Sequence, residues 1–170
     1  LVARRHEGDG LATVLSYAHG DVVQGDDARW SQGLSPWRLT ARDERWYGRG
    51  AADNKGQHLV NLVALEAVLA TRGWLGFNAV WLIEMAEEAG SPGLGAFCEQ
   101  HRGELTADLF IASDGPRVAA EKPTLFMGSR GVMNFDLVCA LRAGSHHSGN
   151  WGGLLTNPAI VLAHALAAIV

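Results

Sequence analysis

The chain has 170 residues, of which 48% are hydrophobic, and a formal net charge of −4. This length and composition are typical of one globular α/β domain with a substantial core, and they exclude an intrinsically disordered chain. The 14 basic residues are scattered along the sequence, so we expect no nucleic-acid or membrane-surface partner. The longest apolar runs, residues 79–83 and 165–170, are too short to span a bilayer, which predicts a soluble protein.

Both cysteines and both ends of the chain give further expectations. Cys98 and Cys139 lie in apolar contexts without metal-site spacing, which favours reduced core thiols and a cytoplasmic protein. No charged-then-apolar leader opens the sequence, which begins at Leu1. Residues 158–170 have the pattern of an apolar helix that stops without a cap. We therefore expect this chain to be a piece of a longer protein.

A histidine and an aspartate follow the first predicted strand, residues 11–17, after an irregular lead-in over residues 1–10. Ligand sites in open α/β sheets gather at the carboxyl ends of strands, where His19 and Asp21 fall. Alternate residues of an extended segment point the same way. Asp21 could therefore accept a hydrogen bond from one imidazole nitrogen of His19 while the other binds a metal. The alternative is a surface histidine at a strand end.

A third candidate, Asp53, lies in the glycine-rich segment WYGRGAADNKGQ, residues 46–57. Glycine allows backbone conformations that are closed to other residues. A helical pattern follows over residues 54–71, and Asp53 or Asn54 is suited to be its N-cap. A capping aspartate in a glycine turn is therefore the alternative to a metal ligand here.

Acidic residues also follow the next two predicted strands. The strand at 77–84 precedes Glu87 and Glu88, and the strand at 109–112 precedes Asp114. Adjacent carboxylates point in different directions, so one could coordinate a cation while its neighbour holds a water; a solvated acidic loop is the alternative. The remaining elements expected in this part of the chain are a hairpin at 38–46 with Asp43 and Glu44 at its tip, and a short helix at 93–101.

These candidates all lie at ends of elements that an α/β sheet would bring to one edge. Four carboxylates gathered there would repel one another unless cations neutralised them. Imidazole and carboxylate ligands without thiolate suit Zn²⁺, Mn²⁺ or Co²⁺. A pair of such ions about 3.5–4 Å apart, bridged by one carboxylate, recurs in hydrolases that activate water.

Four segments, in this order, resemble the M20 metallopeptidases, and within them the cytosolic dipeptidase and carnosinase branch: HGD at 19–21, YGRGAADNKG at 47–56, EMAEEAG at 84–90 and ASDG at 112–115. The resemblance implies a catalytic α/β domain with a mainly parallel sheet flanked by helices. It also implies a cis peptide bond between Asp53 and Asn54. The roles it implies are: His19 and Asp114 bind one metal, Asp53 bridges both, Glu88 binds the second, Glu87 is the general base, and Asp21 orients His19.

The resemblance continues into an inserted α+β lid. Residues 128–131 resemble the hinge before the lid, and residues 132–141 alternate as a lid strand would. The resemblance implies a catalytic domain over residues 1–129 and the beginning of the lid and dimerisation domain over residues 130–170.

A histidine in the lid carries a further implied role. Residues 145–153 are similar to the family's Asp-x-His-Ser-Gly segment, with Ser145 in place of the aspartate. His147 would then contact the substrate in the partner subunit of a homodimer and stabilise the oxyanion. A polar loop is the alternative reading of this segment.

The implied function is hydrolysis of amide bonds in dipeptides or small peptides by two divalent ions, zinc favoured over manganese or cobalt. The metals would activate a bridging water, whose proton Glu87 would take. The family's last metal ligand is a histidine from a segment after the lid, and His164, in the apolar helix, is not a substitute for it. Two alternatives stay open: an N-acyl-amino-acid deacylase of the same family, and a catalytically incomplete fragment that only binds metal or a partner.

Overall fold

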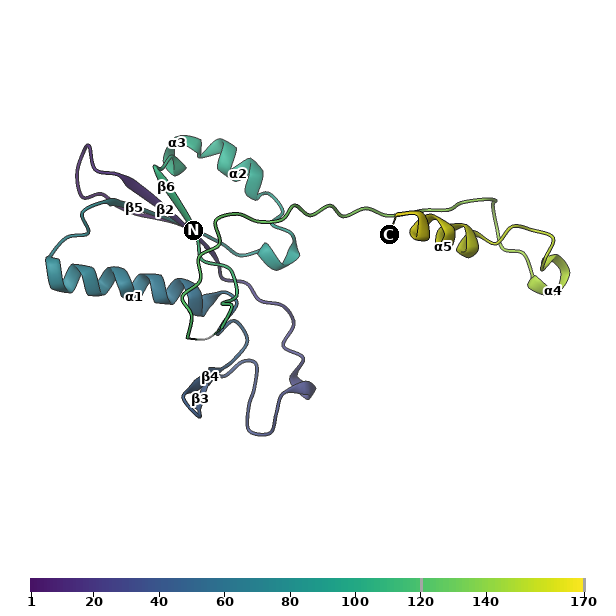
Figure 1. Ribbon diagram of the computed structural model, residues 1–170, viewed down its shortest axis with the longest axis horizontal. Coiled ribbons are helices and arrows are strands. Elements are labelled where there is room, and N and C mark those ends of the chain that lie inside the picture. The colour runs from purple at the N-terminus through teal and green to yellow at the C-terminus, as the bar shows by residue number, and fades with distance from the viewer. Residues whose placement is uncertain (120, 170) are drawn as a thin grey trace. The chain divides into compact units, whose positions relative to one another are not determined.

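The computed structural model describes residues 1–119 and 121–169, and the chain divides into two compact units, Leu1–Thr124 and Leu125–Val170. The first unit is built on a four-stranded sheet with the strand order β1-β5-β2-β6 (Figure 1). Its strands are β1 (Val2–Arg5), β2 (Thr13–His19), β5 (Asn78–Glu84) and β6 (Leu109–Ala112). β2 runs parallel to both β5 and β6, while β1 is antiparallel to β5. The predicted mainly parallel sheet is confirmed.

Helices flank this sheet. They are α1 (Lys55–Arg72), α2 (Leu94–Gln100) and α3 (Arg102–Leu105), with α1 on one side of the sheet and α2 and α3 on the other (Figure 1). Residues 79–82 of β5 are all buried, as expected for an apolar strand between two neighbours with helices on its faces. The core therefore sits around β5 and the carboxyl half of β2, directly behind the edge where the candidate residues lie.

A small hairpin precedes α1. It consists of β3 (Thr40–Arg42) and β4 (Arg45–Tyr47), paired antiparallel. Asp43 and Glu44 form its tip with positive φ angles of 52° and 61°, the backbone of a two-residue turn that matches the twist of the strands. The predicted hairpin is confirmed. Two short 3-10 helices complete the first unit, η1 (Asp27–Arg29) and η2 (Glu87–Ala89).

Two predictions about the amino-terminal strands need correction. Residues 1–10 are not an irregular lead-in throughout, because Val2–Arg5 forms the edge strand β1, paired with residues 79–82 of β5. The strand expected at 11–17 lies two residues later, at Thr13–His19, where its ladder to β5 extends from Thr13 to His19. His19 is therefore the last residue of a central strand and not part of the loop after it.

The second unit contains α4 (Ser148–Trp151) and α5 (Pro158–Ile169). The predicted apolar helix is confirmed as far as Ile169; the last residue of that prediction, Val170, lies outside the described residues. The strand predicted over residues 132–141 is wrong: the described part of this unit contains no strand, and a strand needs a partner for its backbone groups. Within residues 1–119 and 121–169, no helix has both the length and the hydropathy needed to cross a membrane.

Candidate metal centre

The centre of the site is His19, at the carboxyl end of β2 between the ends of β5 and β6. Its side chain is only 1% exposed. Its backbone N–H donates to Oδ1 of Asn54 at 3.1 Å, and the next residue, Gly20, donates to the carbonyl oxygen of Glu84 at 2.9 Å. The backbone of His19 is therefore anchored at the sheet edge, and its ring is buried there.

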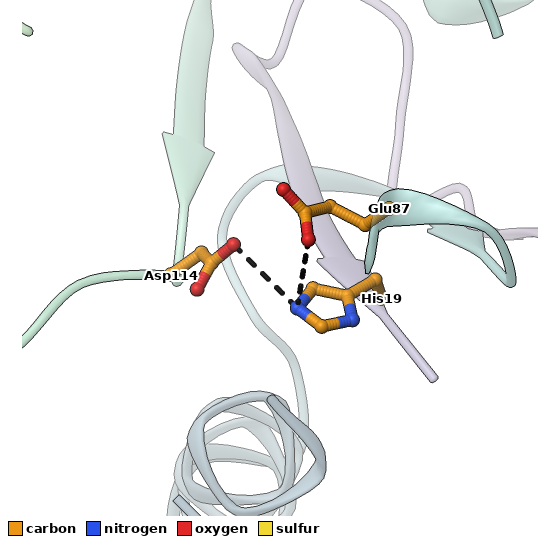
Figure 2. A group of neighbouring side chains, drawn as sticks. All are labelled: His19, Glu87 and Asp114. Atoms are coloured by element: carbon orange, nitrogen blue, oxygen red, sulfur yellow. Dashed lines mark ion pairs between the residues drawn. The ribbon is translucent and has the colours of Figure 1, made fainter. Parts of the chain in front are cut away.

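Three carboxylate oxygens surround the same ring nitrogen, Nε2 of His19. Oδ1 of Asp53 lies 3.0 Å away, Oδ2 of Asp114 3.6 Å and Oε2 of Glu87 3.8 Å. Figure 2 shows Glu87 and Asp114 pointing toward this nitrogen from different elements. The ligand atoms of His19, Glu87 and Asp114 all lie within 4.8 Å of one another.

The clustered charges shift the pKa values of the group. Burial by itself would lower the pKa of His19, but the negative charge of Asp114 and the hydrogen bond with Asp53 outweigh it, and the pKa is raised. Burial also raises the pKa of Glu87, against the opposing charge of His19, and the neighbouring carboxylates raise it further. Both shifts favour binding a positive charge at this place, either a proton or a metal ion.

Asp21 lies behind His19, on the side of the other ring nitrogen. Nδ1 of His19 is 3.3 Å from the backbone carbonyl oxygen of Asp21 and 3.3 Å from its Oδ1. With its proton on Nδ1, facing Asp21, the neutral ring would leave the lone pair of Nε2 free for a metal ion. Asp21 also accepts the backbone N–H groups of Glu87 at 3.2 Å and Glu88 at 3.1 Å.

The two adjacent glutamates take different places. Glu87 contributes its carboxylate to the group around His19, whereas the side chain of Glu88 is exposed and is not one of the three clustered ligands. Asp53 contacts His19 but is 64% exposed. The side chains of His19, Asp53, Glu87 and Asp114 therefore lie together, with Asp21 beside them. Glu88 contacts this group only through its backbone N–H, which donates to Asp21.

Asn54 is a site residue that the sequence did not single out as such. The Asp53–Asn54 peptide bond is cis, as the resemblance implied. Asn54 occupies the N-cap position of α1, but its side chain caps no helix N–H; it is fully buried, accepts from His19 N–H and donates to the carbonyl oxygen of Ser113 at 2.5 Å. The predicted N-cap position of Asn54 is therefore confirmed, but its side chain makes no capping hydrogen bond. Its preference for a helix start was the only local signal at this position.

The histidine expected to contact the substrate, His147, belongs to the second unit and is described within it. His147 is the N-cap of α4, where its Nδ1 accepts the backbone N–H of Gly149 at 3.0 Å. The neutral ring accordingly carries its proton on Nε2. His164 is exposed on α5, as expected for a helix-surface histidine.

The donor set fits a divalent cation. A buried imidazole nitrogen with three carboxylate oxygens around it concentrates negative charge at the sheet edge. Imidazole and carboxylate ligands together suit zinc, manganese or cobalt. His19, Glu87 and Asp114, whose ligand atoms lie within 4.8 Å of one another, could hold such an ion.

The sequence profile described as peptidase family M20/M25/M40 matches residues 15–140, most of the chain. The chain belongs to this family. The resemblance seen in the four motifs is thereby confirmed.

Relatives within the M20 family carry dipeptidase names. The cysteinylglycine-S-conjugate dipeptidase of Corynebacterium striatum is 39% identical over 161 residues, which cover 93% of this chain and 34% of the relative. The beta-Ala-His dipeptidase of Homo sapiens is 35% identical over 161 residues, covering 93% of this chain and 31% of the relative. The dipeptidase and carnosinase branch of the resemblance is borne out. The chain spans about one third of the length of these relatives.

Solved structures agree with the fold. The crystal structure of human carnosine dipeptidase 1 superposes with a TM-score of 0.68 and 31% sequence identity, over 98% of this chain and 35% of that chain. The M20 family metallo-carboxypeptidase Sso-CP2 of Sulfolobus solfataricus superposes with a TM-score of 0.61 and 33% identity, over 66% of this chain and 25% of that one.

Proposed function

We propose that the protein containing this chain is a metallodipeptidase that hydrolyses the amide bond of dipeptides or small peptides with two divalent ions, zinc favoured over manganese or cobalt. The observation that carries the proposal is the convergence of three carboxylate oxygens on Nε2 of His19, in a chain of the M20 family. Two relatives named for Cys-Gly conjugates and beta-Ala-His support dipeptides as the substrate class.

The ligand roles follow the family resemblance, and the contacts of Asp53 and Asp114 with His19 support them. His19 and Asp114 would hold one ion, Glu88 would hold the second, and Asp53 would contribute to both. When bound, the ions would lower the pKa of a water and polarise the substrate carbonyl. Asp21 keeps the imidazole oriented through its Nδ1.

Glu87 acts as the general base. Its carboxylate lies in the group around His19 and is 38% exposed, so it can reach both a water and the leaving amine. The proton that it takes from the attacking water passes to the departing amino group.

His147 supplies a hydrogen-bond donor to the substrate. It comes from the partner subunit of a homodimer formed through the lid. The bond from Gly149 N–H to its Nδ1 favours the tautomer with a proton on Nε2, which can donate to a developing oxyanion. We also propose that residues 130–170 belong to this lid and that the protein is cytoplasmic. Both cysteines are unpaired, which supports the latter.

The test is a substrate panel on the intact protein: Cys-Gly and beta-Ala-His against N-acetyl and N-succinyl amino acids. We expect turnover of dipeptides that a chelator removes and added zinc, manganese or cobalt restores. Preferential turnover of the N-acyl amino acids would identify a deacylase instead. Metal binding with no turnover of either class would leave only a binding protein.

A further inference from the structure

Three carboxamide side chains lie along one face at the start of α1. They are Asn54, at the N-cap, and Gln57 and Asn61 in the first two turns; this spacing of three and four residues puts them on the same side of a helix. All three make hydrogen bonds with the short segment that follows β6. We call these three residues the amide face of α1.

The contacts follow one another along residues 113–115. Asn54 Nδ2 donates to the carbonyl oxygen of Ser113 at 2.5 Å, and Asn61 Nδ2 donates to Oγ of the same serine. Gln57 Oε1 accepts the backbone N–H of Gly115 at 3.1 Å. The amide face therefore holds the residue before and the residue after Asp114.

This segment needs an anchor because the sheet ends just before it. The ladder between β2 and β6 stops at Ala112, and Ser113 N–H makes one more bond, to the carbonyl oxygen of Tyr17 at 3.3 Å. Beyond that point the backbone is held by the hydrogen bonds of Asn54 and Gln57 to Ser113 and Gly115. Asn54 also accepts the backbone N–H of His19, so a single buried amide connects the backbones of two proposed ligands.

We propose that Asn61 and Gln57, together with the buried Asn54, are positioning residues that hold the Asp114 carboxylate in place against His19 for a divalent ion. The inference rests on the proposed function, because it takes the ion as the ligand. Repulsion from Glu87 and Asp53 would otherwise drive the carboxylate of Asp114 toward solvent whenever the ion leaves. Hydrogen bonds behind a ligand commonly affect metal affinity by 10–100-fold.

The decisive experiment is a double-mutant cycle on Asn61 and Ser113 in the intact protein. Asn61→Ala, Ser113→Ala and the double variant are stripped with a chelator and titrated with Co²⁺ by calorimetry, with the visible Co²⁺ spectrum as a second readout. Each single change should weaken Co²⁺ binding about 10-fold and alter the spectrum. The double variant should be no weaker than about 10-fold, since both changes remove the same bond.

A matched glutamine pair gives an independent measurement if Asn61→Ala does not fold. Gln57→Ala should weaken Co²⁺ binding several-fold, whereas Gln100→Ala, on an exposed residue at the end of α2, should not. Unchanged affinity in Gln57→Ala and Asn61→Ala, even with a lower Tm, would overturn the inference alone. The inference would also be overturned if the double variant lost Co²⁺ affinity by the product of the two single losses. An unmodified intact protein that binds no Co²⁺, Zn²⁺ or Mn²⁺ would overturn the proposed function and this inference with it.

Discussion

The carboxylate of Asp21 accepts the backbone N–H of Glu87 at 3.2 Å across 66 residues of sequence. Its other oxygen accepts the N–H of Glu88 at 3.1 Å, while His19 Nδ1 lies 3.3 Å from the first. One aspartate thus fixes both the imidazole and the turn that carries the two glutamates. This turn would lose its anchor and the histidine its orientation if Asp21 changed.

Asp21→Asn should therefore weaken zinc binding by the intact protein by roughly 10–100-fold, because an amide offers one acceptor oxygen where the carboxylate offers two. Calorimetric titration measures this directly. Asp26→Asn is the control, since Asp26 pairs with Arg29 at 3.0 Å on the surface outside the site. Equal zinc affinity in the two variants would contradict the role of Asp21.

Glu87→Gln separates the base from the ligands. We expect zinc content and KM to stay near their original values and kcat to fall by about 10²–10⁴-fold, because the amide cannot take a proton from water. Glu88→Gln should instead release one ion. Metal analysis of both variants is essential, since Glu87 is the nearer of the two to His19 in this structure. If Glu87→Gln lost metal and Glu88→Gln retained it, Glu87 would be the metal ligand and Glu88 the base.

Gly56 in α1 packs closely against the backbone of Ala51, two residues before Asp53. A Cβ built at Gly56 would lie 1.8 Å from the carbonyl oxygen of Ala51, and this backbone atom cannot move aside as a side chain could. Gly56→Ala should lower the free energy of unfolding by about 3 kcal/mol or more, measured by urea denaturation of the intact protein. Gly95→Ala in α2 meets nothing within 4 Å and should be neutral or stabilising by up to about 1 kcal/mol.

Glu7 provides an acid-sensitive contact far from the metal centre. Its side chain is 6% exposed, Oε1 accepts from Arg5 Nε at 2.5 Å, and Oε2 accepts the N–H of Leu75 at 3.2 Å. The hydrogen bond from Arg5 lowers the pKa of Glu7, so its stabilisation is present above the unfolded value near 4.5 and is lost as pH falls below it. Glu7→Gln should reduce Tm at pH 7 and flatten its fall toward pH 3. Asp9→Asn, on an exposed neighbour, should leave both unchanged.

The sequence predicted those elements whose signals are local. β6 was predicted at its observed limits because a short apolar run lies between Asp108 and Ser113. β1 was missed because Val2–Arg5 has no apolar alternation; its strand conformation comes from pairing with β5, more than seventy residues away. The strand expected at 132–141 had the alternation but no partner strand in the described part of its unit. Pairing over long distances is what local patterns do not contain.

The sequence predicted which residues form the site, but it did not predict how their side chains are arranged. Strand ends pointed to His19 and Asp114, because the carboxyl ends of parallel strands meet at one edge, and the glycine-rich segment before a predicted helix pointed to Asp53. The burial of Asn54 could not be predicted, since its helix-capping preference is a local property while its partners are His19 and Ser113. Whether Glu87 or Glu88 turns inward depends on how Asp21 holds the turn between β5 and α2.

The strand order also sets when the site can be assembled. β2 is made early and lies centrally, but β6, which precedes Asp114, is the last strand of the sheet in chain order. A growing chain that has reached α1 already contains His19 and Asp53, yet it still lacks Asp114 and the two glutamates. An ion held by both His19 and Asp114 could therefore bind only after β6 has paired with β2. The paired residues are about 95 positions apart in the sequence, so this pairing is slow compared with the formation of a local helix. Metal uptake during synthesis would accordingly report on the completion of the sheet and not on its beginning.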